Sequence, residues 1–169
     1  MIIIKYIIIL FIFLVSILVG NLISKRYILR TEELKELKGI LNIIKSKIQF
    51  TYEPLPEIFY EISNISNNNI SKIFLVAAQK MKEKNAMDAW NESIEETKTN
   101  LSNEDVKNIK SFGKTLGQTD KEGQISNIEV TESFIEMQIS KARKEEEKNS
   151  KMYKTLGIII GLAFVIILI

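Results

Sequence analysis

Three acidic residues, Asp88, Glu92 and Glu96, recur at four-residue steps. This spacing places side chains on one face of an α-helix. A row of carboxylates on one face can hold a hard cation such as Mg²⁺ or Ca²⁺. It can also form an acidic stripe that attracts a basic partner through charge complementarity. We favour the partner surface as the interpretation and keep the cation site as the alternative.

A second segment, Gly113-Lys114-Thr115, contains residue types that occur in phosphate-binding loops. The G-x-x-x-x-G-K-[ST] spacing of such loops is absent, and the segment follows a predicted helix rather than a strand. We therefore predict no nucleotide site at this position.

The sequence contains no histidine and no cysteine. This excludes His/Cys zinc sites, thiolate nucleophiles, Ser-His-Asp triads and disulfides. The net charge is only +2, and no basic stripe is interleaved with aromatic residues, so nucleic-acid binding is not expected. Chemistry that uses carboxylates alone stays open as an alternative. We predict a non-enzymatic protein with no cofactor, no metal and no small-molecule substrate.

The two ends of the chain are apolar, whereas its middle is charged. Residues 6–23 form a nearly unbroken apolar run, which as a helix spans about 27 Å and so matches the hydrocarbon core of a membrane. A cleaved signal peptide is the alternative, but the first alanine is Ala77, so no A-x-A-like cleavage site lies near the run. We predict an uncleaved anchor over residues 1–24.

The second apolar run covers residues 156–169, about 21 Å as a helix. It reaches about 27 Å when the segment begins at Met152 and Lys154 snorkels to the headgroups. We predict a transmembrane segment over residues 152–169, with a half-inserted tail as the alternative. Gly157 and Gly161 have the small-xxx-small spacing that lets membrane helices approach closely.

Basic residues flank both apolar runs on the side of the central domain. They are Lys25, Arg26, Arg30, Lys141, Arg143, Lys144, Lys148, Lys151 and Lys154. Loops rich in Lys and Arg stay in the cytoplasm, so we predict a cytoplasmic central domain with both termini outside.

Helical periodicity dominates the first half of the central domain. Thr31 is the predicted cap of a helix whose apolar stripe comprises Leu34, Leu37, Leu41, Ile44 and Ile48. Pro54-Leu55-Pro56 makes a firm corner, since the residue before a proline avoids the helical region. A short helix follows over residues 57–62 and a loop over residues 63–71, with Ser71 as the predicted cap of the next helix.

Helical signals continue in the second half of the central domain. Trp90 is interpreted as a core anchor, with partner binding as the alternative. Ser102 to Asp105 resembles a capping box, and Gly117 is placed to end a helix in the left-handed conformation. Thr119 to Glu122 is a capping box that opens the last long helix, with Asp120 or Thr119 as its cap. The predicted inner face of that helix comprises Ile125, Ile128, Ile135, Ile139 and Ala142, widened by Val130, Phe134 and Met137.

The predicted fold is therefore all-α. It consists of a small bundle of about five to six helices over residues 31–151, flanked by N- and C-terminal transmembrane helices.

Several short motifs follow one another along the chain. They are Tyr52-x-Pro54-Leu55-Pro56, Ala89-Trp90 with Ser93, the string from Phe112 through Gly113, Leu116 and Gly117 to Asp120 with Gln124, and the tail from Lys151 to Gly157 and Gly161. With the N-terminal anchor, this order resembles the stage III sporulation protein AB family over essentially the whole chain. The loop over residues 63–71 carries little of the resemblance.

The resemblance implies a role in endospore formation, within a membrane complex that resembles a secretion machine and links the mother cell to the developing spore. It implies a domain similar to the helical cytoplasmic domain of the type II secretion F platform protein. Expected partners are membrane lipid, other proteins of the stage III complex and its cytoplasmic ATPase, sporulation protein AA. The expected location is the bacterial cell membrane, with the central domain on the mother-cell side.

The family motif fits a mainly structural role, with a partner surface as the alternative. The residues concerned are Pro54, Leu55, Trp90, Phe112, Gly113, Leu116, Gly117, Asp120 and Gln124.

The alternative function is that of a membrane-anchored sensor or adaptor. A membrane-anchored sensor or adaptor would place the helical domain outside the cell, where it would bind a ligand. That function requires the opposite topology to the one that the Lys and Arg residues indicate. We therefore expect a platform or assembly component and keep the sensor as the alternative.

Overall fold

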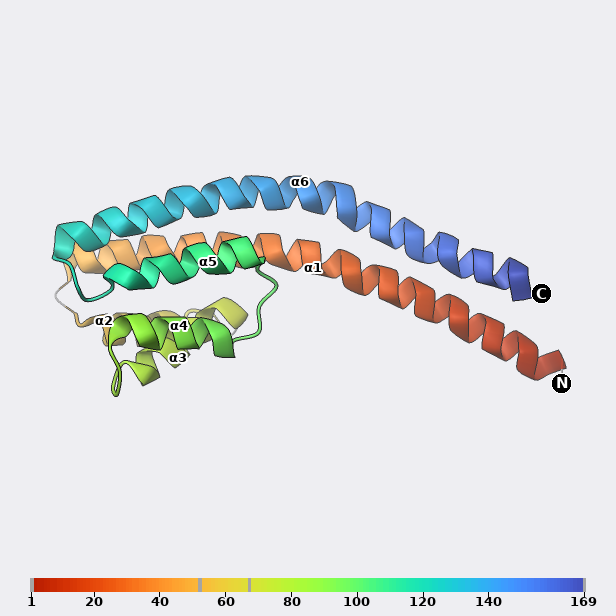
Figure 1. Cartoon of the computed structure of the whole chain (residues 1–169), viewed down its shortest axis with the longest axis horizontal. Helices are drawn as coiled ribbons and strands as arrows, with labels where there is room; N and C mark the ends of the chain where they lie inside the picture. Colours follow the sequence, from red (N-terminus) through yellow and green to blue (C-terminus); the bar gives the residue numbers. More distant parts are fainter. Residues whose placement is uncertain (1, 52, 67, 169) are drawn as a thin grey trace. The chain divides into compact units, whose positions relative to one another are not determined.

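The computed structural model describes residues 2–51, 53–66 and 68–168. Tyr52 of the family motif, Asn67 of the predicted loop and Ile169 of the second apolar run lie outside the described residues. The described chain is all-α, as predicted (Figure 1). Its elements are α1 (Ile2–Phe50), α2 (Leu55–Ser63), α3 (Asn69–Lys80), α4 (Ala86–Glu96), α5 (Asn103–Phe112), the 3₁₀ helix η1 (Gly113–Thr115) and α6 (Lys121–Leu168).

Contacts divide the chain into two compact units. The first, here called the hairpin unit, comprises residues 1–31 and 141–169, and the second, here called the bundle unit, comprises residues 32–140. Both α1 and α6 contribute to each unit, because each helix continues without interruption through the boundary between them. The bundle unit is shorter than the predicted domain of residues 31–151.

The core of the bundle unit begins with the apolar stripe of α1. Leu34, Leu37, Leu41 and Ile44 are each at most 1% exposed, and Ile48 is half-buried. The shorter helices pack against their neighbours in sequence, α2 on α3, α3 on α4, and α4 on α5 and η1. Four aromatic rings meet at their centre: Phe59, Phe74, Trp90 and Phe112. The core thus draws on α1 and on each of the four short helices.

Ion pairs join α1 and α6 within the bundle unit. Lys45 Nζ lies 2.9 Å from Glu132 Oε2, and Lys38 Nζ lies 3.1 Å from Glu136 Oε2. The hydrogen bond from Lys45 to Glu132 raises the pKa of the Lys45 amine despite partial desolvation. These pairs fix the two helices side by side along the edge of the core.

The hairpin unit consists of the N-terminal part of α1 and the C-terminal part of α6, which cross closely at glycines. A Cβ added to Gly20 would lie 2.7 Å from the backbone oxygen of Tyr153, and one added to Gly157 would lie 2.8 Å from that of Ser16. Real Cβ atoms do not approach backbone oxygens so closely. The small-residue spacing of α6 therefore serves contact with α1 of the same chain.

Two helices of the described chain are long and apolar enough to cross a membrane. The most apolar window of 18 residues has a mean hydropathy of 2.8 in Ile3–Phe50 and 1.9 in Lys121–Leu168. Most of their apolar side chains in the hairpin unit are exposed, from Ile3 and Ile4 to Ile166 and Ile167. Such surfaces are stable in lipid and not in water, so the two helices fit a membrane location.

Two predicted helix caps differ from the structure. Thr31 caps nothing: α1 continues through it, and its hydroxyl donates to the Tyr27 carbonyl oxygen one turn back. At α3 the cap is Asn68, whose side-chain oxygen accepts from the Ser71 backbone N–H. At α3 several residues could serve as the cap, and the one that lies next to the first helical turn does so.

At the start of α6 the structure decides between the two predicted caps, Asp120 and Thr119. Asp120, rather than Thr119, accepts a hydrogen bond from the backbone of the first turn, at the Gly123 N–H, over 2.9 Å. The capping box at Ser102 and Asp105 is confirmed, with both of its hydrogen bonds present. Gly117 is confirmed in the left-handed conformation, with φ of +70°, but α5 already ends at Phe112 and η1 intervenes.

The inner face of α6 is narrower than predicted. Ile128, Ile135, Ile139 and Ala142 are buried, as expected. Val130 is 67% exposed and Met137 is 56% exposed, so these two do not widen the face. Val130 and Met137 lie on the side of α6 that faces away from the core. The apolar character of these two residues alone could not show this.

Candidate functional site

The family-motif residues of α4, α5 and η1 gather around Trp90. This side chain is fully buried, and its Nε1–H donates to the Ile109 carbonyl oxygen over 2.8 Å. The Phe112 ring stands edge-on to the indole, with the ring centroids 5.5 Å apart. A buried indole that satisfies its N–H in this way anchors α4 on α5.

Gly113 lies directly against the Trp90 ring. A Cβ at this position would overlap the indole atom Cδ1. Leu116, three residues further on, is 3% exposed and belongs to the buried core. Gly117 then reverses the chain in the left-handed conformation, which residues with a Cβ rarely adopt. The string from Phe112 to Gly117 is therefore a tightly packed connection between α5 and α6.

Polar side chains fasten this connection to the first turns of α6. Asp120 caps the helix, and Gln124 Nε2 donates to the Thr119 carbonyl oxygen over 3.2 Å. Asn127 Nδ2 donates to the Phe112 carbonyl oxygen over 3.1 Å and also contacts the Thr115 hydroxyl. Asn127 was not among the predicted site residues, because nothing local distinguishes it from other polar residues of a helix.

Pro54 and Leu55 occupy a different place. They stand at the N-terminus of α2, with Pro54 exposed at the cap position and Leu55 half-buried in the first turn. They shape the corner between α1 and α2 and are not part of the connection between α5 and α6. The structure thus brings most of the motif residues together and leaves these two apart.

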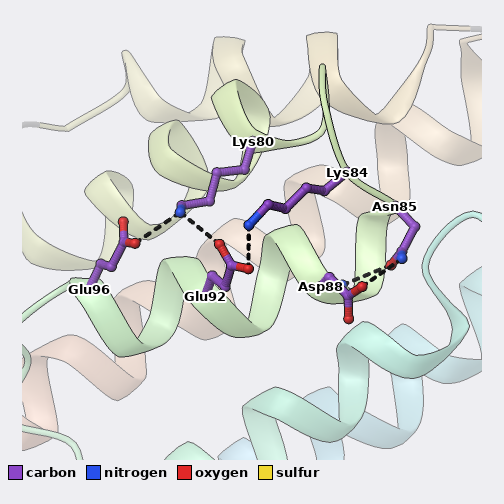
Figure 2. A network of polar contacts seen from close by, with 6 residues as sticks. All are labelled: Lys80, Lys84, Asn85, Asp88, Glu92 and Glu96. Atoms are coloured by element: carbon purple, nitrogen blue, oxygen red, sulfur yellow. Dashed lines mark hydrogen bonds and ion pairs between the residues drawn. The ribbon is translucent and has the colours of Figure 1, made fainter.

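Two residues of the acidic stripe on α4, Glu92 and Glu96, are engaged by lysines of the preceding segment (Figure 2). Lys80 Nζ lies 2.8 Å from Glu92 Oε2 and 2.9 Å from Glu96 Oε1, and Lys84 Nζ lies 2.6 Å from Glu92 Oε1. The hydrogen bond from Lys80, followed by that from Lys84, lowers the pKa of Glu92 to about 2. The same contacts raise the pKa of Lys80.

Asp88 stands apart from these pairs, since its carboxylate accepts a hydrogen bond from the Asn85 side-chain amide and its backbone N–H donates one to the Asn85 side-chain oxygen at the start of α4. The stripe is therefore a network of mixed charge, and part of the negative charge that would attract a basic partner is already neutralised. Within the described residues, no group of three or more carboxylates is arranged to hold a metal ion. As a partner surface the stripe stays a prediction.

Polar groups also link the two helices of the hairpin unit, next to the glycine crossing. The Ser24 and Ser150 hydroxyls lie 2.7 Å apart, and the Tyr27 and Tyr153 rings stack with centroids 5.9 Å apart. Arg30 Nη1 donates to Glu145 Oε2 over 2.6 Å. These contacts continue the pairing of the helices beyond the apolar segments.

Comparison with known proteins assigns the family. The family model for stage III sporulation protein AB matches residues 5–169. The chain belongs to this family. The stage III sporulation protein AB of Bacillus subtilis (strain 168) is 26% identical over 153 residues, which cover 88% of this chain and 90% of that protein. A solved structure of stage III sporulation protein AB has the same fold, with a TM-score of 0.66 at 21% identity, and covers 71% of this chain and 98% of that one.

Membership of the stage III sporulation protein AB family supports involvement in the sporulation complex, with other proteins of that complex as partners. The relatives are named as sporulation proteins and not as enzymes. The match includes both apolar helices as well as the bundle unit, so the family assignment and the membrane location fit together.

Proposed function

We propose that this protein is a non-enzymatic membrane platform of a secretion-like sporulation complex and that its helical domain engages the cytoplasmic ATPase of that complex, sporulation protein AA. One observation carries the proposal: the family match spans a helical bundle together with an apolar helix at each end. A bundle fixed to a membrane at both ends is suited to holding other proteins at a defined place.

The use of the polar side chains supports a platform over an enzyme. Trp90, Asp120 and Gln124 make the hydrogen bonds that hold α4, α5 and α6 in place. Glu92 is paired with two lysines. Groups that are committed to structure in this way are not available for proton transfer or nucleophilic attack.

The proposed orientation rests on the distribution of Lys and Arg. Lys25 and Arg26 follow the first apolar run, and Lys148, Lys151 and Lys154 precede or enter the second. Positive charge of this kind stays on the cytoplasmic side. We assign residues 31–151 to the cytoplasm on the mother-cell side and residues 1–24 and 152–169 to the membrane.

The test is direct binding between purified proteins. The full-length chain is reconstituted in lipid nanodiscs and immobilised, and purified ATPase is passed over it. Saturable binding is expected, and empty nanodiscs should retain none. A Trp90→Asp variant, which places a charge in the core, should unfold the bundle and abolish the signal. Absence of saturable binding to the wild-type chain would remove the ATPase from the proposal.

A further inference from the structure

A groove lies between α4 and α5. It has a volume of about 410 Å³ and is open to solvent. Asn91 and Glu95 of α4 form one wall, and Lys107, Lys110 and Lys114 of α5 and η1 form the other. The groove does not include Asp88, Glu92 or Glu96, so it is a separate surface of the bundle unit.

The groove carries positive charge. Its three lysines recur at steps of three and four residues along α5 and η1, and all three line the groove. Lys110 Nζ lies 2.5 Å from Glu95 Oε1, which neutralises one of the three. Lys107 and Lys114 are exposed. Three lysines against one glutamate leave a surplus of two positive charges along the groove.

The wall opposite these lysines contains an unsatisfied amide. The side-chain oxygen Oδ1 of Asn91 is buried and accepts no hydrogen bond within the described part of the chain. A buried acceptor without a donor is costly, so native structures contain few of them. An occupant of the groove that brings an N–H donor would remove this cost once the Asn91 amide turns towards it.

We propose that this groove binds an acidic segment of the ATPase. The inference rests on the proposed function and names the surface that would bind the ATPase. Carboxylates of the segment would meet Lys107 and Lys114, and a peptide N–H would meet the Asn91 amide. A polypeptide supplies both acceptors and donors, whereas inorganic phosphate or a lipid phosphate supplies mainly acceptors. Charge complementarity together with the unsatisfied amide therefore favours a protein over a simple anion.

The experiment compares charge-reversed variants of the full-length chain in nanodiscs. Lys107→Glu/Lys114→Glu should weaken binding of the purified ATPase by roughly tenfold at physiological ionic strength, because attraction becomes repulsion. The matched control is Lys72→Glu/Lys82→Glu, which makes the same change in charge at exposed lysines outside the groove. It should bind like the wild type. Equal binding by the groove variant and the wild type would overturn the inference and leave the proposed function intact.

A second variant separates binding from folding. Asn91→Leu keeps the size of the side chain and removes the unsatisfied oxygen, so its Tm should equal or exceed that of the wild type. Its affinity for the ATPase should nevertheless fall severalfold. A lower Tm with unchanged affinity would show that Asn91 is structural and would contradict its assigned contact.

Inorganic phosphate tests whether the groove binds a small anion instead of an acidic peptide segment. At constant ionic strength it should not displace the ATPase from the wild-type chain. Displacement would show that the groove is a site for small anions and would overturn the proposal of a peptide segment. If the wild-type chain binds no ATPase at all, the proposed function fails and this assignment of the groove fails with it.

Discussion

At the residue scale, Gly113 shows how one missing side chain determines the packing of the bundle. Its α-carbon faces the indole of Trp90 so closely that a Cβ would overlap the ring. The indole cannot move aside easily, because it is fully buried and donates to the Ile109 carbonyl oxygen. Gly39 offers the opposite case, since a Cβ there would meet nothing within 4 Å.

Gly113→Ala should therefore destabilise the bundle by about 1–3 kcal/mol, the usual range for overpacking in a core. Gly39→Ala, in the middle of α1, should stabilise it by roughly 0.5–1 kcal/mol because alanine favours a helix. Urea unfolding of the full-length chain in detergent measures both, with circular dichroism as the signal. A Gly113→Ala variant as stable as the wild type would show that the indole does not hold its place.

The Lys80–Glu92–Lys84 contacts predict a pH dependence. Glu92 has a pKa of about 2 in the folded chain, against an ordinary value of 4.5. Between these pH values the unfolded chain binds more protons at this carboxyl group than the folded chain. The stabilisation from Glu92 is therefore complete above pH 4.5 and is lost as the pH falls towards 2.

Urea midpoints measured across this range check the prediction, with the lone Trp90 as the fluorescent reporter. The difference in midpoint between wild type and Glu92→Gln should shrink as the pH falls from 4.5 towards 2. Glu83→Gln is the matched control, since Glu83 is exposed and lies in the turn between α3 and α4, and its curve should run parallel to that of the wild type. A constant difference for Glu92→Gln would contradict the assigned contacts.

At the scale of elements, the crossing of α1 and α6 depends on Gly20 and Gly157. In a membrane the approach of helices is favoured by small residues, which bring the backbones together. Gly157→Leu should separate the helices, because its side chain would meet the Ser16 backbone oxygen. Ala163→Leu adds similar bulk on an exposed face of α6 and should have no effect.

The distance between α1 and α6 can be followed by a disulfide. The chain has no cysteine, and the Ser24 and Ser150 hydroxyls lie 2.7 Å apart. A Ser24→Cys/Ser150→Cys variant should therefore form a disulfide on oxidation, measured as protection from a thiol-reactive polymer. Adding Gly157→Leu should reduce the disulfide yield severalfold, and adding Ala163→Leu should not. Equal yields would mean that Gly157 does not set the crossing.

The elements also show which features a sequence reveals. Long helices and their order were predictable, because apolar periodicity persists over many residues. The choice of the capping residue was not predictable. At α3 both Asn68 and Ser71 are suitable, and at α6 both Thr119 and Asp120 are, so that the local geometry decides which residue caps the helix. The fastening of the α5–α6 connection by Asn127 was also hidden, because it depends on contacts between separate elements.

At the scale of the whole molecule, the hydropathy of the chain ends and the short family motifs both agree with what was found. The apolar ends were visible because hydropathy averages over about 20 residues and does not depend on tertiary contacts. The family motifs pointed to the stage III sporulation protein AB family, which the match over residues 5–169 confirms. The groove beside Lys107 and Lys114 was not visible, because α4 and α5 create it only when they pack together.

The measurement that most directly tests the central claim determines on which side of the membrane the bundle lies. Lys72 of α3 is exposed, and Lys72→Cys supplies the only thiol in the full-length chain. In intact cells this thiol should resist a membrane-impermeant maleimide, and it should react fully once the cells are permeabilised. Prompt labelling in intact cells would place the bundle outside the cytoplasm and would contradict a platform for a cytoplasmic ATPase.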